Sequence, residues 1–136
     1  MVKVSFKKEE ILTNKEFGES LEKRTRQFAV KVVRLSLTLP NTPESRVIRN
    51  QLTKSASSVG ANYYEANRSR SRNDFINKIK ICESEANETI FWLDMLTDLK
   101  WADNSVLVSE LKNEVKQLLA IFTSTGRKLR EKNEKN

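Results

Sequence analysis

Glu83, Glu85 and Glu88 lie close together in the chain and are the first candidates for metal chemistry. Helical bundles build di-metal carboxylate sites from inward-facing glutamates, but two of their helices normally carry Glu-x-x-His. This chain has no histidine, and its single cysteine, Cys82, leaves the usual zinc ligand sets incomplete. We therefore interpret the three glutamates as a solvated or intersubunit acidic face, and the sequence predicts no metal site.

A second candidate lies at residues 55–75, which read SASSVGANYYEANRSRSRNDF. A phosphate-binding loop would need more glycines and a preceding strand. The small residues instead continue a helical period, so Gly60 is predicted to lie inside a helix, where a neighbouring backbone comes close. No serine, lysine or tyrosine has a recognisable base and oxyanion hole beside it. The sequence therefore predicts no enzyme and no cofactor.

Basic side chains gather after this stretch of small residues, and guanidinium groups are well suited to phosphate. They are Arg68, Arg70, Arg72, Lys78 and Lys80. The formal net charge of +7 also raises the concentration of polyanions around the protein. These five residues are therefore predicted to contact the phosphates of RNA or DNA, with Tyr64 as a candidate for stacking on unpaired bases.

The same arginines allow a purely structural interpretation. They lie near the end of the predicted second helix, where cations are favoured by the helix dipole and can pair with carboxylates. Tyr64 would then serve in packing. The segment 83–98 that follows holds five acidic residues and no basic one, so the molecule is expected to have two oppositely charged ends.

Apolar spacing and capping residues divide the chain into four helices. The first begins at a capping box at residues 13–16 and is stopped by Pro40, and the second begins with Thr42 as its N-cap. Residues 71–74 have capping-box spacing before the third, and Asn104 is a candidate cap for the fourth. The predicted core positions are Phe17, Leu21, Phe28, Val32, Leu35 and Leu39; Ile48, Leu52, Ala56, Val59, Tyr63 and Ala66; Phe75, Ile79, Cys82, Ala86, Ile90, Leu93 and Leu96; and Leu107, Leu111, Val115, Leu118, Phe122 and Leu129.

Four amphipathic helices with short connections predict an all-α fold, an antiparallel up-down four-helix bundle. Residues 1–13 are expected to form an N-terminal leader, residues 14–130 the bundle domain, and residues 131–136 a polar tail that frays.

No apolar run reaches the length of a membrane span and no signal peptide is visible, so a cytoplasmic protein is expected. Apolar residues on a second side of the first and third helices predict self-association. They are Val30, Val33, Leu37, Ile81, Phe91, Trp92 and Met95.

Three segments in unbroken order carry a family resemblance. They read RTRQFAVKVVRLSLTLP, RVIRNQLTKSASSVGANYYEANRSRSRNDFINKIKI and ESEANETIFWLDML. Their most distinctive part is the small-residue run followed by Asn-Tyr-x-Glu-Ala, a Ser-Arg turn and Asp-Phe. From Arg24 to Leu96 the chain resembles the four helix bundle protein family, also called the 23S rRNA-intervening sequence proteins.

The resemblance implies a small antiparallel bundle that assembles as a homopentamer, with some members encoded inside intervening sequences of bacterial 23S rRNA genes. It also implies kinship with the accessory variability proteins of diversity-generating retroelements, which bind nucleic acid and work with a reverse transcriptase.

The family motif falls on matching positions to which the resemblance assigns structural roles. Together with Gly60 they are Asn62, Glu65, Ser71, Asp74, Phe75, Glu85 and Glu88. Glu65 is expected to be partly buried and bonded to Arg68, Arg72 or backbone N–H groups near Ser71, because an unpaired buried carboxylate is costly. Ser84 and Asn87 stand where members often carry another acidic residue, which weighs further against a metal.

The sequence thus predicts a non-enzymatic, oligomeric bundle that binds RNA or DNA near the turn between its second and third helices. The alternative is a protein-interaction scaffold, or an accessory subunit of an RNA-processing or reverse-transcribing complex, whose basic surface meets an acidic protein. A membrane partner is not expected.

Overall fold

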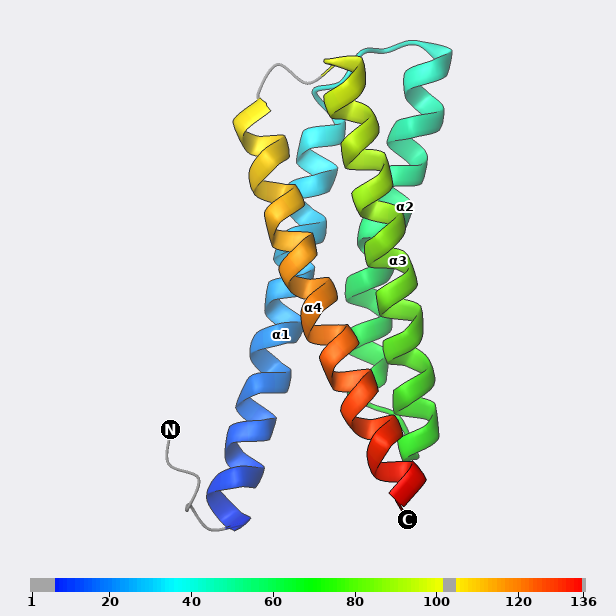
Figure 1. Ribbon diagram of the computed structural model, residues 1–136. Helices are drawn as coiled ribbons and strands as arrows, with labels where there is room; N and C mark the ends of the chain where they lie inside the picture. The colour runs from blue at the N-terminus through cyan, green and yellow to red at the C-terminus, as the bar shows by residue number, and fades with distance from the viewer. Residues whose placement is uncertain (1–6, 102–104, 136) are drawn as a thin grey trace.

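Four helices make up the computed structural model, which describes residues 7–101 and 105–135. They are α1 (Lys7–Ser36), α2 (Pro43–Ala66), α3 (Arg72–Leu99) and α4 (Ser105–Lys135). Successive helices run in opposite directions (Figure 1), so the predicted antiparallel up-down four-helix bundle is confirmed. Within the described ranges, no helix is long and apolar enough to cross a membrane.

The helix starts of α2 and α3 follow from single side chains. Thr42 has an extended backbone and accepts a hydrogen bond from the N–H of Ser45 at 3.1 Å, with Pro43 at the first helical position. Ser71 does the same for α3, accepting from the N–H of Asp74 at 3.1 Å. Both predicted caps are confirmed, and they fix where the α2–α3 turn begins and ends.

The helix ends depart from the sequence-based expectation in three places. α1 begins at Lys7 rather than at residues 13–16, because the residues before Thr13 contain no helix breaker. It ends at Ser36, ahead of Pro40, in a tight turn in which the N–H of Leu39 bonds the carbonyl of Ser36 at 3.3 Å. α4 continues through the polar tail to Lys135, since that segment also lacks a breaker. The predicted cap Asn104 lies outside the described residues.

The predicted apolar stripes form the core, and all six predicted positions on α2 are buried. Phe17 is the clear exception, with 52% of its surface exposed, because it lies beside an open surface pocket between α1 and α4. Thr25 and Thr89 are fully buried. They were not among the predicted core positions, because apolar periodicity does not count threonine. The hydroxyl of Thr25 donates to the carbonyl of Glu22 at 3.0 Å, which offsets the cost of its burial.

α2 and α3 meet along a seam of small side chains. The hydroxyl oxygens of Ser55 and Thr89 lie 2.9 Å apart in the core, and each also lies near a carbonyl of its own helix. The sulfur of Cys82 lies 3.7 Å from the carbonyl oxygen of Val59, so the two backbones are close here. Burial raises the pKa of the Cys82 thiol to about 12. Cys82 is therefore an inert core residue, as predicted.

Gly60 lets α1 approach the other side of α2. A Cβ atom at this position would lie 3.4 Å from the carbonyl oxygen of Thr25 and 3.6 Å from the N atom of Arg26. These are ordinary contact distances, so one methyl group fits beside the α1 backbone. The prediction that Gly60 lies inside a helix at a close backbone approach is confirmed.

α1 and α4 are joined by a polar cluster, and they separate toward the lower end of the bundle in Figure 1. Arg24 donates from Nε and Nη2 to the two carboxylate oxygens of Glu114, at 2.7 and 2.8 Å, and from Nη2 to Gln117 at 2.8 Å. This two-pronged geometry is the strongest form of an arginine–carboxylate pair. It lowers the pKa of Glu114 and raises that of Arg24.

Two substitutions at Gly60 distinguish the effect of side-chain size at this contact from the effect of helix propensity on stability. Gly60→Leu places three more carbon atoms than alanine at this contact and should lower the free energy of unfolding by about 1 to 3 kcal/mol, the usual cost of overpacking. Gly60→Ala should leave stability unchanged or raise it by up to about 1 kcal/mol, because alanine favours the helix and its methyl group fits. Urea denaturation checks both, and a neutral Gly60→Leu variant would contradict the close contact.

The Arg24–Glu114 pair should make part of the stability depend on pH. The pKa of Glu114 is lower in the folded state than the unfolded value of about 4.3, so the pair stabilises fully above that pH. Its contribution disappears as the pH falls through the folded-state pKa. Glu114→Gln should therefore cost about 1 kcal/mol or less at pH 7 and nothing in strong acid, as measured by denaturation at several pH values.

Glu110→Gln is the matched control, because Glu110 is exposed and forms no ion pair within the described residues. Its effect on the free energy of unfolding should be small at every pH. If Glu114→Gln still has a lower free energy of unfolding than the wild type below pH 3, the carboxylate is not the stabilising group.

Candidate nucleic-acid interface

Arg68, the first of the predicted phosphate-binding cations, is already engaged within the protein. Its Nη1 donates to the carboxylate of Glu22 at 3.1 Å and to the carbonyl of Tyr64 at 2.8 Å. Its guanidinium also lies 3.6 Å from the centre of the Tyr64 ring, in cation–π contact. Arg68 thus closes the end of α2 in the way that the structural interpretation expected. Half of its side chain stays exposed.

The other four predicted cations differ in how free they are. Lys78 forms an ion pair with Glu65 at 2.6 Å, and Arg72 donates to the amide oxygen of Asn133 on α4 at 3.4 Å. Arg70 and Lys80 are exposed and have no polar partner in the part of the chain that the structure describes. Arg70, Arg72 and Lys80 therefore carry charge that no carboxylate within the described residues neutralises.

Glu65 does not take the place expected for it. Its side chain is 59% exposed, and its bond goes to Lys78 rather than to Arg68, Arg72 or the backbone near Ser71. The reason is topological: Glu65 lies in the last turn of α2, and antiparallel packing brings Lys78 of α3 beside it. The expected burial and bonding partners were therefore wrong.

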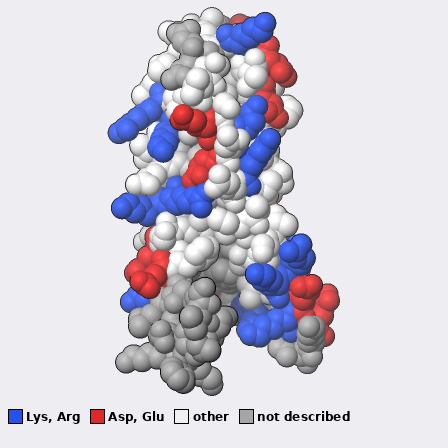
Figure 2. All heavy atoms as spheres, turned by 60° about the vertical axis from the view of Figure 1, so that its left-hand side comes forward, with Lys and Arg blue, Asp and Glu red and all other residues white. Residues whose placement is uncertain are grey.

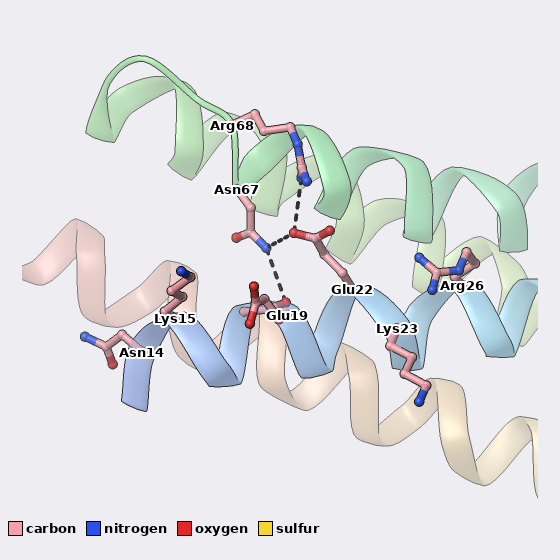
Figure 3. A pocket seen from close by; sticks show the side chains of 9 residues that line it. Asn14, Lys15, Glu19, Glu22, Lys23, Arg26, Asn67 and Arg68 are labelled. Carbon is pink, nitrogen blue, oxygen red and sulfur yellow. Dashed lines mark hydrogen bonds and ion pairs between the residues drawn. The ribbon is translucent and has the colours of Figure 1, made fainter. Parts of the chain in front are cut away.

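α1 contributes cations to the same end of the bundle. A surface pocket of about 650 Å³ lies between α1 and the end of α2, and its cations are Lys15, Lys23, Arg26 and Arg68. Figure 3 shows Glu22 of α1 pointing between Asn67 and Arg68, and its Oε2 accepts from Asn67 at 2.7 Å. Partial burial disfavours the charged carboxylate, but the hydrogen bonds from Asn67 and Arg68 outweigh this and lower the pKa of Glu22.

α4 brings a second set of cations to this end. Asn133 donates to Asn73 at 3.4 Å and accepts from Arg72, so the last turns of α4 lie beside the start of α3. The cations in these turns are Arg127, Lys128, Arg130 and Lys132. They were missed because the basic run after Gly126 was assigned in part to a fraying tail. The α1 cations were missed because only the tertiary fold brings them near the α2–α3 turn.

We call the whole set the basic end. It consists of Lys15, Lys23, Arg26, Arg68, Arg70, Arg72, Lys78, Lys80, Arg127, Lys128, Arg130 and Lys132.

The acidic segment 83–98 does not form a separate acidic surface within the described residues, because cations of neighbouring helices lie beside it. Asp94 of α3 pairs with Lys112 of α4 at 2.7 Å, and Lys54 of α2 acts electrostatically on Glu85. Figure 2 shows one face of the molecule, on which Lys and Arg lie among acidic side chains, with a group of Lys and Arg at the lower right beside an acidic one. Neighbouring helices supply the cations that segment 83–98 lacks.

The three glutamates considered for metal chemistry have different partners. Glu83 accepts from Thr123 of α4 at 3.2 Å, and Glu88 accepts from the indole N–H of Trp92 at 3.0 Å. Burial, and secondarily the charge of Glu88, raise the pKa of Glu85. Among the described residues, no three acidic or cysteine side chains are grouped so that they could hold a metal ion.

Comparisons with known proteins place this bundle in a family. Residues 20–124 match the family described as 23S rRNA-intervening sequence protein. A solved structure from Bacteroides thetaiotaomicron, described as a protein of unknown function from the S23 ribosomal protein family, is 32% identical with a TM-score of 0.71. That similarity covers 77% of this chain and 96% of the other. No curated protein matches the chain. The chain therefore belongs to the 23S rRNA-intervening sequence protein family.

Proposed function

We propose that this protein is a non-enzymatic, oligomeric helical bundle that binds RNA or DNA through its basic end. One observation carries the proposal: three separate segments, in α1, at the α2–α3 turn and in α4, bring their cations to the same end of the bundle. A protein gains affinity for nucleic acid by replacing the counterions of the phosphates with its own lysines and arginines. Cations that are clustered but not paired are best placed to do so.

The cations within the basic end should not contribute equally to phosphate binding. Arg68 and Lys78 would have to share their charge between a phosphate and the carboxylate that each already contacts. Arg70, Arg72 and Lys80 contact no carboxylate within the described residues. On binding a phosphate they would lose only contacts with solvent and, for Arg72, the hydrogen bond to the Asn133 amide. We therefore assign the main phosphate contacts to these three.

Self-association is part of the proposal, because two exposed apolar patches lie on different helices. Val30, Val33 and Leu37 recur at helical spacing on α1, and on α3 the exposed ring of Phe91 lies against that of Trp92. Two different patches on one chain suit a head-to-tail contact that closes into a ring. The family resemblance implies five copies, and a ring would present several basic ends to one strand.

The same apolar patches also support an alternative function, binding to a partner protein. An accessory subunit of an RNA-processing or reverse-transcribing complex would use them, together with the basic end, to bind an acidic protein. Such an interface would depend less on salt than binding to phosphates does.

The salt dependence of binding should identify the phosphate contacts. Replacing Arg70, Arg72 and Lys80 by Gln should flatten the plot of log affinity against log salt by about 2 to 3 units, since each lost contact removes roughly 0.7 to 0.9. Folding should be unaffected, because surface substitutions of this kind change stability little. Fluorescence anisotropy titrations with a labelled oligonucleotide at several salt concentrations provide the measurement.

The control for this experiment changes net charge equally at the other end of the bundle. Arg34, Arg46 and Arg49 lie near the α1–α2 connection and can be replaced by Gln together. This variant should keep the wild-type slope. Equal flattening in both variants would show that only overall charge matters, and an unchanged slope in the first would favour the protein-binding alternative.

Assembly should depend on the apolar patch of α3. Phe91 is 54% exposed, and Phe91→Asp should shift the mass toward that of the 15.7 kDa chain by placing a charge in the contact. Val106→Asp on α4, at a position that is also exposed, should not. Multi-angle light scattering distinguishes these outcomes, and a wild-type monomer at micromolar concentration would contradict the proposed assembly.

A further inference from the structure

A small apolar pocket lies on the surface between α1 and α2, beside the basic end. It has a volume of about 240 Å³, and its lining includes Ala29 of α1 and Gly60, Ala61 and Tyr64 of α2. Gly60 has no side chain, and Ala29, Ser57 and Ala61 beside it have small ones, which leaves the pocket open. The pocket is smaller than the sites that hold drug-sized ligands, so it suits a single ring system.

Two charged side chains join this pocket to the larger basic one. Glu22 and Arg26 line both, and Figure 3 shows them side by side on α1. The Oε2 atom of Glu22 accepts from Asn67 and Arg68, whereas its Oε1 atom has no partner within the described residues. Arg26 likewise forms no side-chain bond there. A free acceptor and a free donor thus lie at the edge of an apolar pocket.

Tyr64 adds an aromatic wall to the pocket. Its ring is half exposed, and the guanidinium of Arg68 lies over it at 3.6 Å from the ring centre. Arg68 is itself part of the larger basic pocket. A planar cation and an aromatic ring in contact form the kind of surface on which unpaired bases stack.

We propose that this pocket holds one unpaired base of a single-stranded nucleic acid, an inference that rests on the proposed function. The base would lie over Gly60 and Ala61 against Tyr64, and its polar edge would meet the carboxylate of Glu22 and the guanidinium of Arg26. The adjoining phosphates would lie on the larger basic pocket. Bases inside a duplex are stacked on their neighbours and cannot enter, so the site selects single strands.

A base fits the pocket better than an aliphatic side chain of a partner protein. An aliphatic group would cover the Oε1 atom of Glu22 and the guanidinium of Arg26 without offering them hydrogen bonds, and burial of polar groups without hydrogen bonds is costly. A base brings donors and acceptors on its edge and an apolar face, and it is joined to phosphates that match the cations beside the pocket.

Filling the pocket tests the proposal directly. Ala61 is exposed on α2, so Ala61→Leu should fold normally while its longer side chain occupies the space. Its affinity for a labelled oligouridylate should fall by about 5- to 150-fold, the range expected for loss of one stacked base. Its affinity for a duplex of the same length, and its salt slope, should match those of the wild type. Ser84→Leu on α3, also an exposed site, should change none of these quantities.

A second probe needs no mutation. The wild type should bind an oligonucleotide made of abasic sites less tightly than oligouridylate, by a similar factor. Equal affinities for the two, or unchanged oligouridylate binding by Ala61→Leu, would overturn the base pocket while leaving phosphate binding in place. A change in assembly mass with Ala61→Leu would instead show an interface between copies and would also overturn it. If the wild type binds neither single strands nor duplexes, the proposed function itself fails and this inference fails with it.

Discussion

The close approach of two neighbours to α2 is the constraint on which the rest of this bundle depends. On one side, Ser55, Val59 and Cys82 let α3 approach until a sulfur contacts a carbonyl. On another, Gly60 lets the backbone of α1 come within contact distance. Helices carrying larger side chains at these positions would lie further apart. The small-residue run thus allows close packing of the helices, and it also leaves the apolar pocket beside Tyr64 open.

The up-down topology converts charges scattered along the chain into one basic end. The first turns of α3, the last turns of α2 and α4 and the early part of α1 all lie at the same end of an antiparallel bundle. None of these segments holds enough cations to bind a strand strongly by itself. At the same time, Glu22 and Glu65 neutralise part of the charge, so that Arg70, Arg72 and Lys80 are the cations without a carboxylate partner among the five predicted from the sequence.

Arg68 shows how a structural and a functional interpretation can apply to one residue. Its bonds to Glu22 and Tyr64 tie the end of α2 to α1, so it has the capping role expected of a cation at a helix C-terminus. The same bonds hold its guanidinium over the ring of Tyr64, at the edge of the larger pocket. An arginine fixed in this way loses less conformational freedom when a ligand binds.

The sequence by itself determined the helices, most of the core and the α2–α3 turn, because these depend on local chemistry. The caps at Thr42 and Ser71, the apolar period of α2 and the glycine inside that helix can all be identified from neighbouring residues in the chain. Only the tertiary structure decided which charges pair. Glu65 meets Lys78, Glu22 meets Arg68 and Arg24 meets Glu114 because helix packing, not sequence distance, sets which side chains come within reach. The pockets and the basic end could not be predicted for the same reason, since each is formed by segments that are distant in the chain.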